Sequence, residues 1–407
     1  MFNPTLDTRL VIDGQEFRFS PHPAVPTLVW GQEGRHAIVY RLQNHGVAYA
    51  LKVFRPVFRH QGLLEAANAL SSYYELPGMR VCKQTVITYE THPWLVEQYE
   101  DLDYAMLMPW IEGRTWFDYL QTRDRLTLDQ CRAVAENTAW VLYALELNHL
   151  AHCDLSSGNV IIDPRLDQIH LVDVEDLYSP WLEPPPMLPS GSAGYQHSSV
   201  GHSGQWGPLG DRFAGAVLMA EMLGWAHPEV RRAAWGESYF SPDELQHQTE
   251  RYEILLAALR AYEAGFAEVF EETWWADSLD SCPPLKTWYD LVDALPRSPV
   301  AEWAPIGAAL LLEEAPAPPE VAWGGSPQPA PVKPRSEPQA TERQSRRPSR
   351  RGCRSVAMVG ATLVLLCCLA AFLALELSYL QGHLACLSPL SAMALPLIGV
   401  IVVSRSC

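Results

Sequence analysis

Two long runs of uncharged, apolar residues near the C-terminal end most strongly constrain how this 407-residue chain folds. Val356–Leu375 and Leu384–Val403 each hold twenty residues without a charge, which is enough to span a bilayer as one helix. A buried core helix is the alternative for either run, and the second run contains Pro389 and Pro396. We therefore predict a transmembrane helix over 355–376 and a second membrane-spanning segment over 384–403.

An arginine strip lies immediately before the first apolar run, at Arg346, Arg347, Arg350, Arg351 and Arg354. Basic residues beside a membrane span mark its cytoplasmic side. The rest of the chain is therefore expected to be cytoplasmic, whether one or both runs cross the bilayer. The strip is also a candidate for contact with anionic lipid head groups, although its effect on topology alone would account for it.

The segment 297–354 differs in composition from everything before it, because Pro, Ala, Ser, Glu and Arg dominate there. Such a stretch buries too little apolar surface to offset its ordering entropy, so we predict a disordered Pro/Arg-rich linker. Eight basic and two acidic residues fall between Lys333 and Arg354, whereas the whole chain carries a net charge of −17. The remaining, acidic body argues against general nucleic-acid binding.

The body itself, residues 28–296, begins with alternating apolar and polar residues and continues with longer helical periodicity. We take 1–27 as an N-terminal extension. Predicted strands cover 28–30, 37–42, 47–53, 81–89 and 94–99, and predicted helices cover 61–76, 128–150, 211–223, 250–270 and 285–295. A strand-rich front with one helix, followed by a helical rear, predicts a two-lobed α+β domain.

The most informative motif is His152-Cys-Asp154-Leu-Ser-Ser-Gly-Asn159, between a predicted long helix and an apolar strand. A carboxylate there can orient a hydroxyl and accept its proton, and an amide oxygen five residues later can bind Mg²⁺. A second acid, Asp173, ends a short apolar strand further along. Upstream, Lys52 interrupts an apolar strand and needs an anionic partner. This set points to phosphoryl transfer.

In order and spacing, these residues resemble the protein kinase superfamily, in particular the eukaryotic-type Ser/Thr kinases of bacteria. The resemblance runs from about Leu28 to Leu295. It implies a bilobal fold with a small β-rich lobe and a large helical lobe. It also implies that Lys52 holds ATP phosphates, Asp154 is the catalytic base, and Asn159 and Asp173 bind Mg²⁺, with Mn²⁺ as the alternative ion.

The resemblance also implies a nucleotide pocket. Gly34 and Val39 match the phosphate loop and the strand that follows it, and Ala50 would line the adenine. The segment 104–113 resembles the hinge. The hinge residues are Met108 at the gatekeeper position, Pro109 with a carbonyl for adenine, and Ile111 with an N–H. Pro109 lacks an N–H, but that position needs only its carbonyl.

A helix glutamate should pair with Lys52 in this family. Glu65 lies near the start of the predicted helix 61–76 and Glu75 near its end. We prefer Glu65, because the Leu-Pro-Gly after Glu75 is typical of the following turn. A solvated position on the helix surface is the alternative for Glu65.

Several positions depart from the family pattern. Gly34 alone remains of the three usual glycines, which makes close backbone approach to phosphates less favourable. Cys153 replaces the arginine before the catalytic aspartate, Ser156 replaces a lysine that contacts the transferred phosphate, and Glu175 replaces the glycine of the metal triplet. Losing the lysine should slow transfer without abolishing nucleotide binding.

Three functions follow from these observations. The first is a membrane-anchored kinase that transfers the ATP γ-phosphate to Ser/Thr hydroxyls of a protein substrate. The second is a pseudokinase that binds nucleotide and acts as a scaffold or adaptor. The third, a small-molecule kinase related to aminoglycoside or choline phosphotransferases, is disfavoured by the segments around Tyr195 and Asp211. Membrane lipid and a second copy of the chain are further candidate partners.

Overall fold

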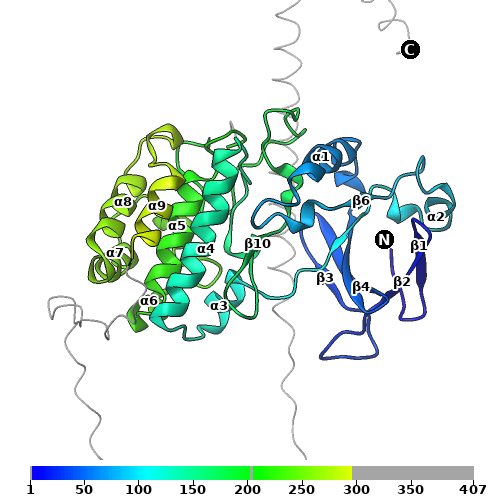
Figure 1. Cartoon of the computed structure of the whole chain (residues 1–407), viewed down its shortest axis with the longest axis horizontal. Helices are drawn as coiled ribbons and strands as arrows, with labels where there is room; N and C mark the ends of the chain where they lie inside the picture. The colour runs from blue at the N-terminus through cyan, green and yellow to red at the C-terminus, as the bar shows by residue number, and fades with distance from the viewer. Residues whose placement is uncertain (1, 202–204, 296–407) are drawn as a thin grey trace, which may run out of the picture. The chain divides into compact units, whose positions relative to one another are not determined.

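The computed structural model describes residues 2–201 and 205–295, and these form a mixed α+β unit (Figure 1). Figure 1 shows a curled sheet at one end of this unit and a group of helices at the other. The predicted linker 297–354 and the predicted membrane segments 355–376 and 384–403 lie outside the described residues. Within residues 2–201 and 205–295, no helix is both long and apolar enough to cross a bilayer.

The main sheet is antiparallel, with the strand order β1-β2-β4-β5-β7-β6, and β3 pairs with β4 on the side. Its strands are β1 (Arg9–Ile12), β2 (Gln15–Phe19), β3 (Gly31–Glu33), β4 (Ala37–Asn44), β5 (Val47–Phe54), β6 (Thr85–Val86) and β7 (Met106–Pro109). In β5 the last five residues are all buried, so this strand runs through the centre of the sheet. The predicted strands 37–42 and 47–53 are confirmed.

The predicted extension contains two strands of the sheet, β1 and β2. β1 and β2 form a hairpin around Asp13 and Gly14, which both have positive φ, as an Asp-Gly turn of this kind requires. β2 then pairs with β4, and Phe17 with its neighbours joins one of the two apolar clusters. The expected boundary at residue 28 is therefore too late.

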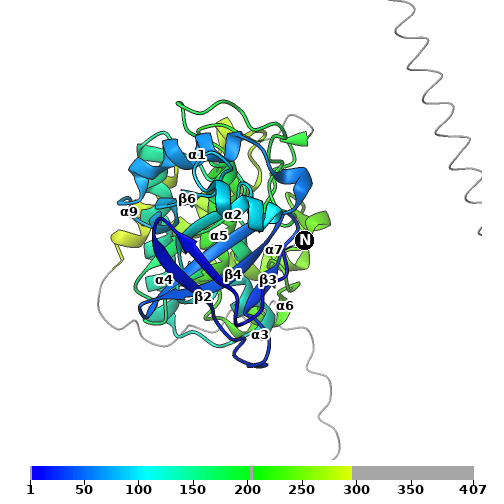
Figure 2. The ribbon, with the colours of Figure 1, turned by 90° about the vertical axis from the view of Figure 1, so that its right-hand side faces the viewer.

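Two other predicted strands are wrong. Residues 94–98 belong to α2 (Pro93–Gln98), in which Pro93 occupies the first helical turn, where its missing N–H costs nothing. Of residues 81–89 only Thr85–Val86 is a strand, and a 3₁₀ turn at Arg80–Cys82 comes before it. Figure 2 shows α1 (Gly62–Leu70) and α2 beside the strands of the sheet.

The helical part is built around α5 (Arg212–Gly224), in which every residue after Arg212 is buried. α4 (Leu128–Leu147) packs against α5 and α9 (Leu285–Asp293), and it begins with a capping box between Thr127 and Gln130. The predicted helices 128–150, 211–223 and 285–295 are confirmed within a few residues. The remaining helices are α3 (Trp116–Thr122), α6 (Pro228–Ala233), α7 (Glu250–Tyr262) and α8 (Ala264–Trp274).

A small antiparallel sheet, β8 (Arg114–Thr115), β9 (Val160–Ile162) and β10 (Ile169–Leu171), lies in the segments around the candidate site. β9 follows directly after the predicted catalytic loop, and β10 ends two residues before Asp173. Because Val160 pairs with Leu171, the loop before β9, which contains Asp154 and Asn159, and the segment after β10, which contains Asp173, leave the sheet at the same edge.

Candidate functional site

Lys52 is the centre of the site. It lies on β5, is 6% exposed, and its ammonium donates to Oδ1 of Asp173 at 2.8 Å and to Oε2 of Glu175 at 2.9 Å. These partners come from the segment after β10, more than 120 residues away in the sequence. A lysine buried in an apolar strand requires such partners, because an unpaired buried charge is very costly. The structure thus brings together Lys52 and Asp173, two of the predicted site residues.

The charges of this cluster stabilise each other. Burial opposes the positive charge of Lys52, but the carboxylates of Asp173 and Glu175 outweigh that effect and raise the pKa of the ammonium. In return, the Lys52 ammonium lowers the pKa of Asp173 below its usual value. Lys52 and Asp173 therefore stabilise each other's charged forms.

The predicted pairing of Glu65 with Lys52 is not what the structure shows. Glu65 is an exposed residue in the first turn of α1, and its carboxylate accepts a hydrogen bond from Gln61 at 3.0 Å. Glu75, the weaker candidate, is also exposed and accepts from Tyr74. The buried face of α1 consists of Leu63, Ala66, Ala67 and Leu70, so Glu65 faces away from the sheet.

Glu175 takes the position next to Lys52 because of the local backbone. Asp173 has a left-handed conformation with φ of +59°, and the 3₁₀ turn Val174–Asp176 follows at once. In this turn the side chain of Glu175 is 11% exposed and returns to Lys52, whereas the side chain of Asp173 is 54% exposed. Sequence reasoning noted Glu175 as a departure from the family but missed this contact.

The predicted catalytic loop is held by buried hydrogen bonds. The Asp211 carboxylate, at the N-terminal end of α5, accepts from the backbone amides of His152 at 2.6 Å and Cys153 at 2.8 Å. His152 Nε2 lies 2.8 Å from the carbonyl oxygen of Val172, the residue before Asp173. His152 is therefore structural, and it ties the loop to the segment that carries Asp173.

Asp154 and Asn159 sit together in this loop. The Asn159 side-chain nitrogen donates to the Asp154 carbonyl at 2.8 Å, and the Asn159 carbonyl accepts from the Val172 amide at 3.0 Å. With its nitrogen engaged, Asn159 is left with its side-chain oxygen as the available group. An amide oxygen and a half-exposed carboxylate, Asp173, are hard oxygen ligands that fit Mg²⁺ bound together with phosphate. Within the described residues no three His, Cys, Asp or Glu side chains form a metal-binding group of their own.

Asp154 has the properties of a carboxylate that handles a proton. Burial raises the pKa of Asp154, and the hydrogen bond that its Oδ1 accepts from the Ser192 hydroxyl, at 2.8 Å, opposes that rise. Ser192 comes from the segment around Tyr195, three residues before that tyrosine. Asp154 therefore already accepts a hydrogen bond from a serine hydroxyl.

Two further titratable side chains, Asp176 and His36, lie near these residues. Burial, together with the nearby negative charges of Glu175 and Asp154, raises the pKa of Asp176 to about 6. His36, in the turn between β3 and β4, has a lowered pKa because of burial and the positive charges of Arg35 and Lys52. Neither residue was singled out from the sequence, since only the fold brings them near Lys52.

Three of the predicted adenine-side residues share one face of the sheet. Val39 pairs with Lys52 in the register of β4 and β5, and Ala50 pairs with Met108 on β7. Ala50, Met108 and Ile111 are buried in the larger apolar cluster, and Val39 packs against it. Pro109, the last residue of β7, pairs with Tyr49 and therefore lies on the opposite face. The structure thus brings Val39, Ala50 and Met108, but not Pro109, to the same face as Lys52.

The predicted phosphate loop is a tight turn between β3 and β4. The Gly34 amide donates to the Ala37 carbonyl at 2.8 Å, so the turn closes on itself. At the other end of the β3–β4 hairpin, the Arg41 guanidinium lies 4.9 Å from the Trp30 ring centre and 5.5 Å from the Trp110 ring centre. The two tryptophans are in mutual contact, with ring centres 5.2 Å apart. This aromatic group next to the hinge was not anticipated.

The chain matches no known protein-family model, and no curated protein is significantly similar to it in sequence.

Proposed function

We propose that this chain is an ATP-dependent protein kinase of the eukaryotic type, bilobal in architecture, which phosphorylates Ser or Thr hydroxyls of proteins. The observation that carries the proposal is the contact between Lys52 on β5 and Asp173 after β10, with Asp154 and Asn159 held beside it. A lysine, a general base and two oxygen ligands at one place are the parts that phosphoryl transfer needs.

The roles follow from the environment of each group. The buried Lys52 ammonium would bind phosphate oxygens of ATP, and Asn159 and Asp173 would hold Mg²⁺. The bound metal supplies charge neutralisation on the transferred phosphate. Asp154 would orient the substrate hydroxyl and take its proton, a task for which a raised pKa is an advantage. Ser156, where a lysine is usual, leaves one cation fewer, so slow transfer is expected.

The second candidate function, a nucleotide-binding scaffold without transfer, is favoured by one specific contact. Ser192 occupies Oδ1 of Asp154, the atom that a substrate hydroxyl would approach. If this hydrogen bond persists in the presence of substrate, Oδ1 is closed to the substrate hydroxyl and only Oδ2 can take its proton. Either function needs nucleotide at Lys52, and only the kinase needs Asp154.

The membrane anchor is part of the same proposal. It depends on the apolar runs at 355–376 and 384–403, on the arginine strip before them and on the contact with lipid that these imply. In this arrangement the kinase unit is cytoplasmic and acts on proteins close to the membrane. Extraction of membranes at alkaline pH should leave the full-length chain in the membrane pellet, whereas a chain released into the supernatant would contradict the anchor.

The experiment that tests the kinase uses the full-length chain in mild detergent with γ-labelled ATP, Mg²⁺ and a basic protein substrate. Asp154→Asn should abolish transfer while ATP binding persists. The matched control is Asp290→Asn, which changes an exposed aspartate on α9 that pairs with Lys286. Transfer equal in wild type and Asp154→Asn would refute the role of Asp154. ATP binding without any transfer by wild type would favour the scaffold.

A further inference from the structure

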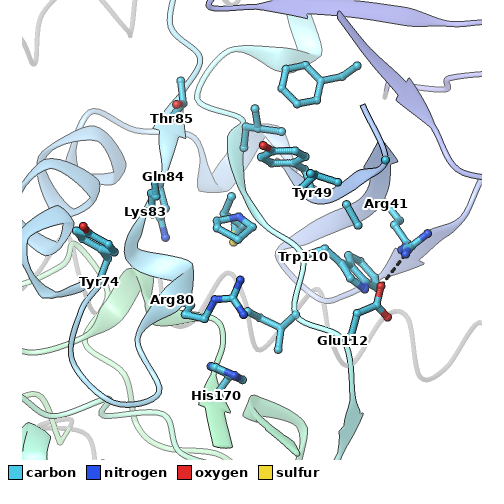
Figure 3. Close-up of a pocket in the computed structure, with 18 of the residues that line it drawn as sticks. Arg41, Tyr49, Tyr74, Arg80, Lys83, Gln84, Thr85, Trp110, Glu112 and His170 are labelled. Carbon is cyan, nitrogen blue, oxygen red and sulfur yellow. Dashed lines mark hydrogen bonds and ion pairs between the residues drawn. The ribbon is translucent and has the colours of Figure 1, made fainter. Parts of the chain in front are cut away.

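A second site lies on the opposite side of β7 from the catalytic groups. A cavity of about 1150 Å³ is bounded by the β1–β2 hairpin, the start of β5, β7 and the β9–β10 turn (Figure 3). Lys52, Asp154 and Asp173 do not line it, whereas Met108, Pro109 and Ile111, the hinge residues of the predicted nucleotide pocket, do. It is larger than most small-molecule pockets, which hold about 300–1,000 Å³, so a ligand with a sizeable body can enter.

One wall of this cavity is apolar and aromatic. Phe17, Val47 and Leu107 line it from the sheet, and Tyr49 adds a second aromatic ring. Burying apolar ligand surface against such a wall is favourable by roughly 25 cal/mol per Å². This wall therefore fits a ring or a short aliphatic chain.

The opposite wall carries positive charge that the protein itself leaves unpaired. The acidic residues of the cavity all have partners: Glu112 binds Arg41 at 2.6 Å, Asp163 accepts backbone amides, and Asp13 contacts His92. Arg80 and Lys83 also line the cavity, and neither forms a side-chain hydrogen bond or ion pair with any described residue. The Lys83 ammonium lies 5.9 Å from the Tyr74 ring centre.

His170 provides an independent observation. It is 6% exposed, lines the cavity from β10, and its Nδ1 is buried without a hydrogen-bond partner among residues 2–201 and 205–295. Burial and the positive charge of Arg80 lower the pKa of His170, while Asp163 opposes this shift. Buried polar atoms without a partner are rare and call for an explanation, such as a missing ligand. In Figure 3, Arg80 lies between Lys83 and His170.

We propose that this cavity binds a phosphorylated small molecule, with the phosphate at Arg80, Lys83 and His170 and an apolar or aromatic body against Phe17 and Leu107. Two unpaired cations match the charge of a phosphate monoester, and guanidinium groups bind its oxygens with charge-assisted hydrogen bonds. The inference does not depend on the proposed kinase activity, because no catalytic group lines the cavity.

Isothermal titration calorimetry with phenyl phosphate tests the site on the full-length chain in mild detergent. Inorganic phosphate and phenol are the probes for each half of the ligand. We expect one phenyl phosphate per chain, bound at least tenfold more tightly than either half. Arg80→Gln with Lys83→Gln should weaken phenyl phosphate binding tenfold or more, because the double variant loses the charge-assisted hydrogen bonds to the phosphate.

Two controls separate this site from other anion sites. Arg232→Gln with Lys286→Gln removes the same charge from α6 and α9 and should leave binding unchanged. Lys52→Met should also leave it unchanged, and loss of binding in Lys52→Met would place phenyl phosphate in the nucleotide site instead. No binding, binding unaffected by Arg80→Gln with Lys83→Gln, or inorganic phosphate binding as tightly as phenyl phosphate would each overturn the proposal.

Discussion

Glu175 offers the sharpest test of how Lys52 is held. Its carboxylate lies 2.9 Å from the Lys52 ammonium, and both side chains are almost completely buried, at 11% and 8% exposure. Glu175→Gln keeps the size and an oxygen acceptor but removes the negative charge. Lys52 then depends on Asp173, whose side chain is largely exposed to solvent.

The magnitude follows from these contacts. Breaking a buried ion pair costs about 3–5 kcal/mol when the remaining charge has no partner. Here Asp173 remains at 2.8 Å, so the cost should be near that of one charge-assisted hydrogen bond, about 1.5–3 kcal/mol. We therefore expect Glu175→Gln to lower the free energy of unfolding by roughly 2 kcal/mol.

Urea unfolding of the full-length chain, followed by tryptophan fluorescence, measures this loss. Glu65→Gln is the matched control, because Glu65 is exposed and should change the free energy of unfolding by less than about 0.5 kcal/mol. In the transfer assay, Glu175→Gln should lower kcat/KM for ATP about tenfold, and Glu65→Gln should have no effect.

The opposite pattern would refute the reasoning. If Glu65→Gln destabilises the protein and lowers kcat/KM while Glu175→Gln does neither, the working partner of Lys52 is the helix glutamate. If Glu175→Gly increases transfer, Glu175 restrains the site and does not position Lys52.

Three further changes have defined outcomes. Ser192→Ala removes a hydrogen bond that lowers the pKa of Asp154. The acidic limb of the pH–rate profile should therefore move to higher pH. An unmoved limb would show that this contact is absent from the working site. Burial raises the pKa of Glu221 to about 7. Because a protein loses stability as pH rises through the raised pKa of a buried acid, ionisation of Glu221 should lower the free energy of unfolding by about 2–3 kcal/mol between pH 5 and pH 8. Glu221→Gln should lack this loss in urea unfolding, and parallel pH curves would contradict it. Gly113 has φ of +154°, and a Cβ at this position would collide with the Ile162 carbonyl. Gly113→Ala should therefore lower the free energy of unfolding by about 2 kcal/mol or more in the same assay. A change under about 0.5 kcal/mol would refute this.

Local signals predicted much of this fold. The capping box at Thr127 and Gln130 and the apolar periodicity after it indicate α4 within a few residues. The hairpin at Asp13-Gly14 had an equally strong signal that the sequence reasoning overlooked, which is why the sheet begins earlier than expected. The apolar residues of 94–99 favour a strand. Pro93 favours the first turn of a helix, and the structure has α2 there.

The candidate site also combines residues that the sequence predicts with one contact that it does not predict. Asp154, Asn159 and Asp173 could be selected because their spacing along the chain reflects loops fixed by short strands and turns. The partner of Lys52 could not, since it depends on the left-handed backbone at Asp173 and the turn after it. Aspartate is among the residues that adopt this conformation, but sequence alone does not fix it. The resemblance to protein kinases therefore favours Glu65 as the partner of Lys52. In the structure, the left-handed backbone at Asp173 directs Glu175 to Lys52 instead.

The two acids that contact Lys52 have different environments, and this difference suggests how a divergent site could still work. Asp173 is half-exposed and can turn towards a metal and a nucleotide, whereas Glu175 is buried and has Lys52 as its partner. If nucleotide binding draws Asp173 away, Glu175 still compensates the buried ammonium, so Lys52 stays in place. In the proposed kinase, a residue next to the metal ligand would thus do what a helix glutamate does elsewhere, and α1 would be free of that constraint.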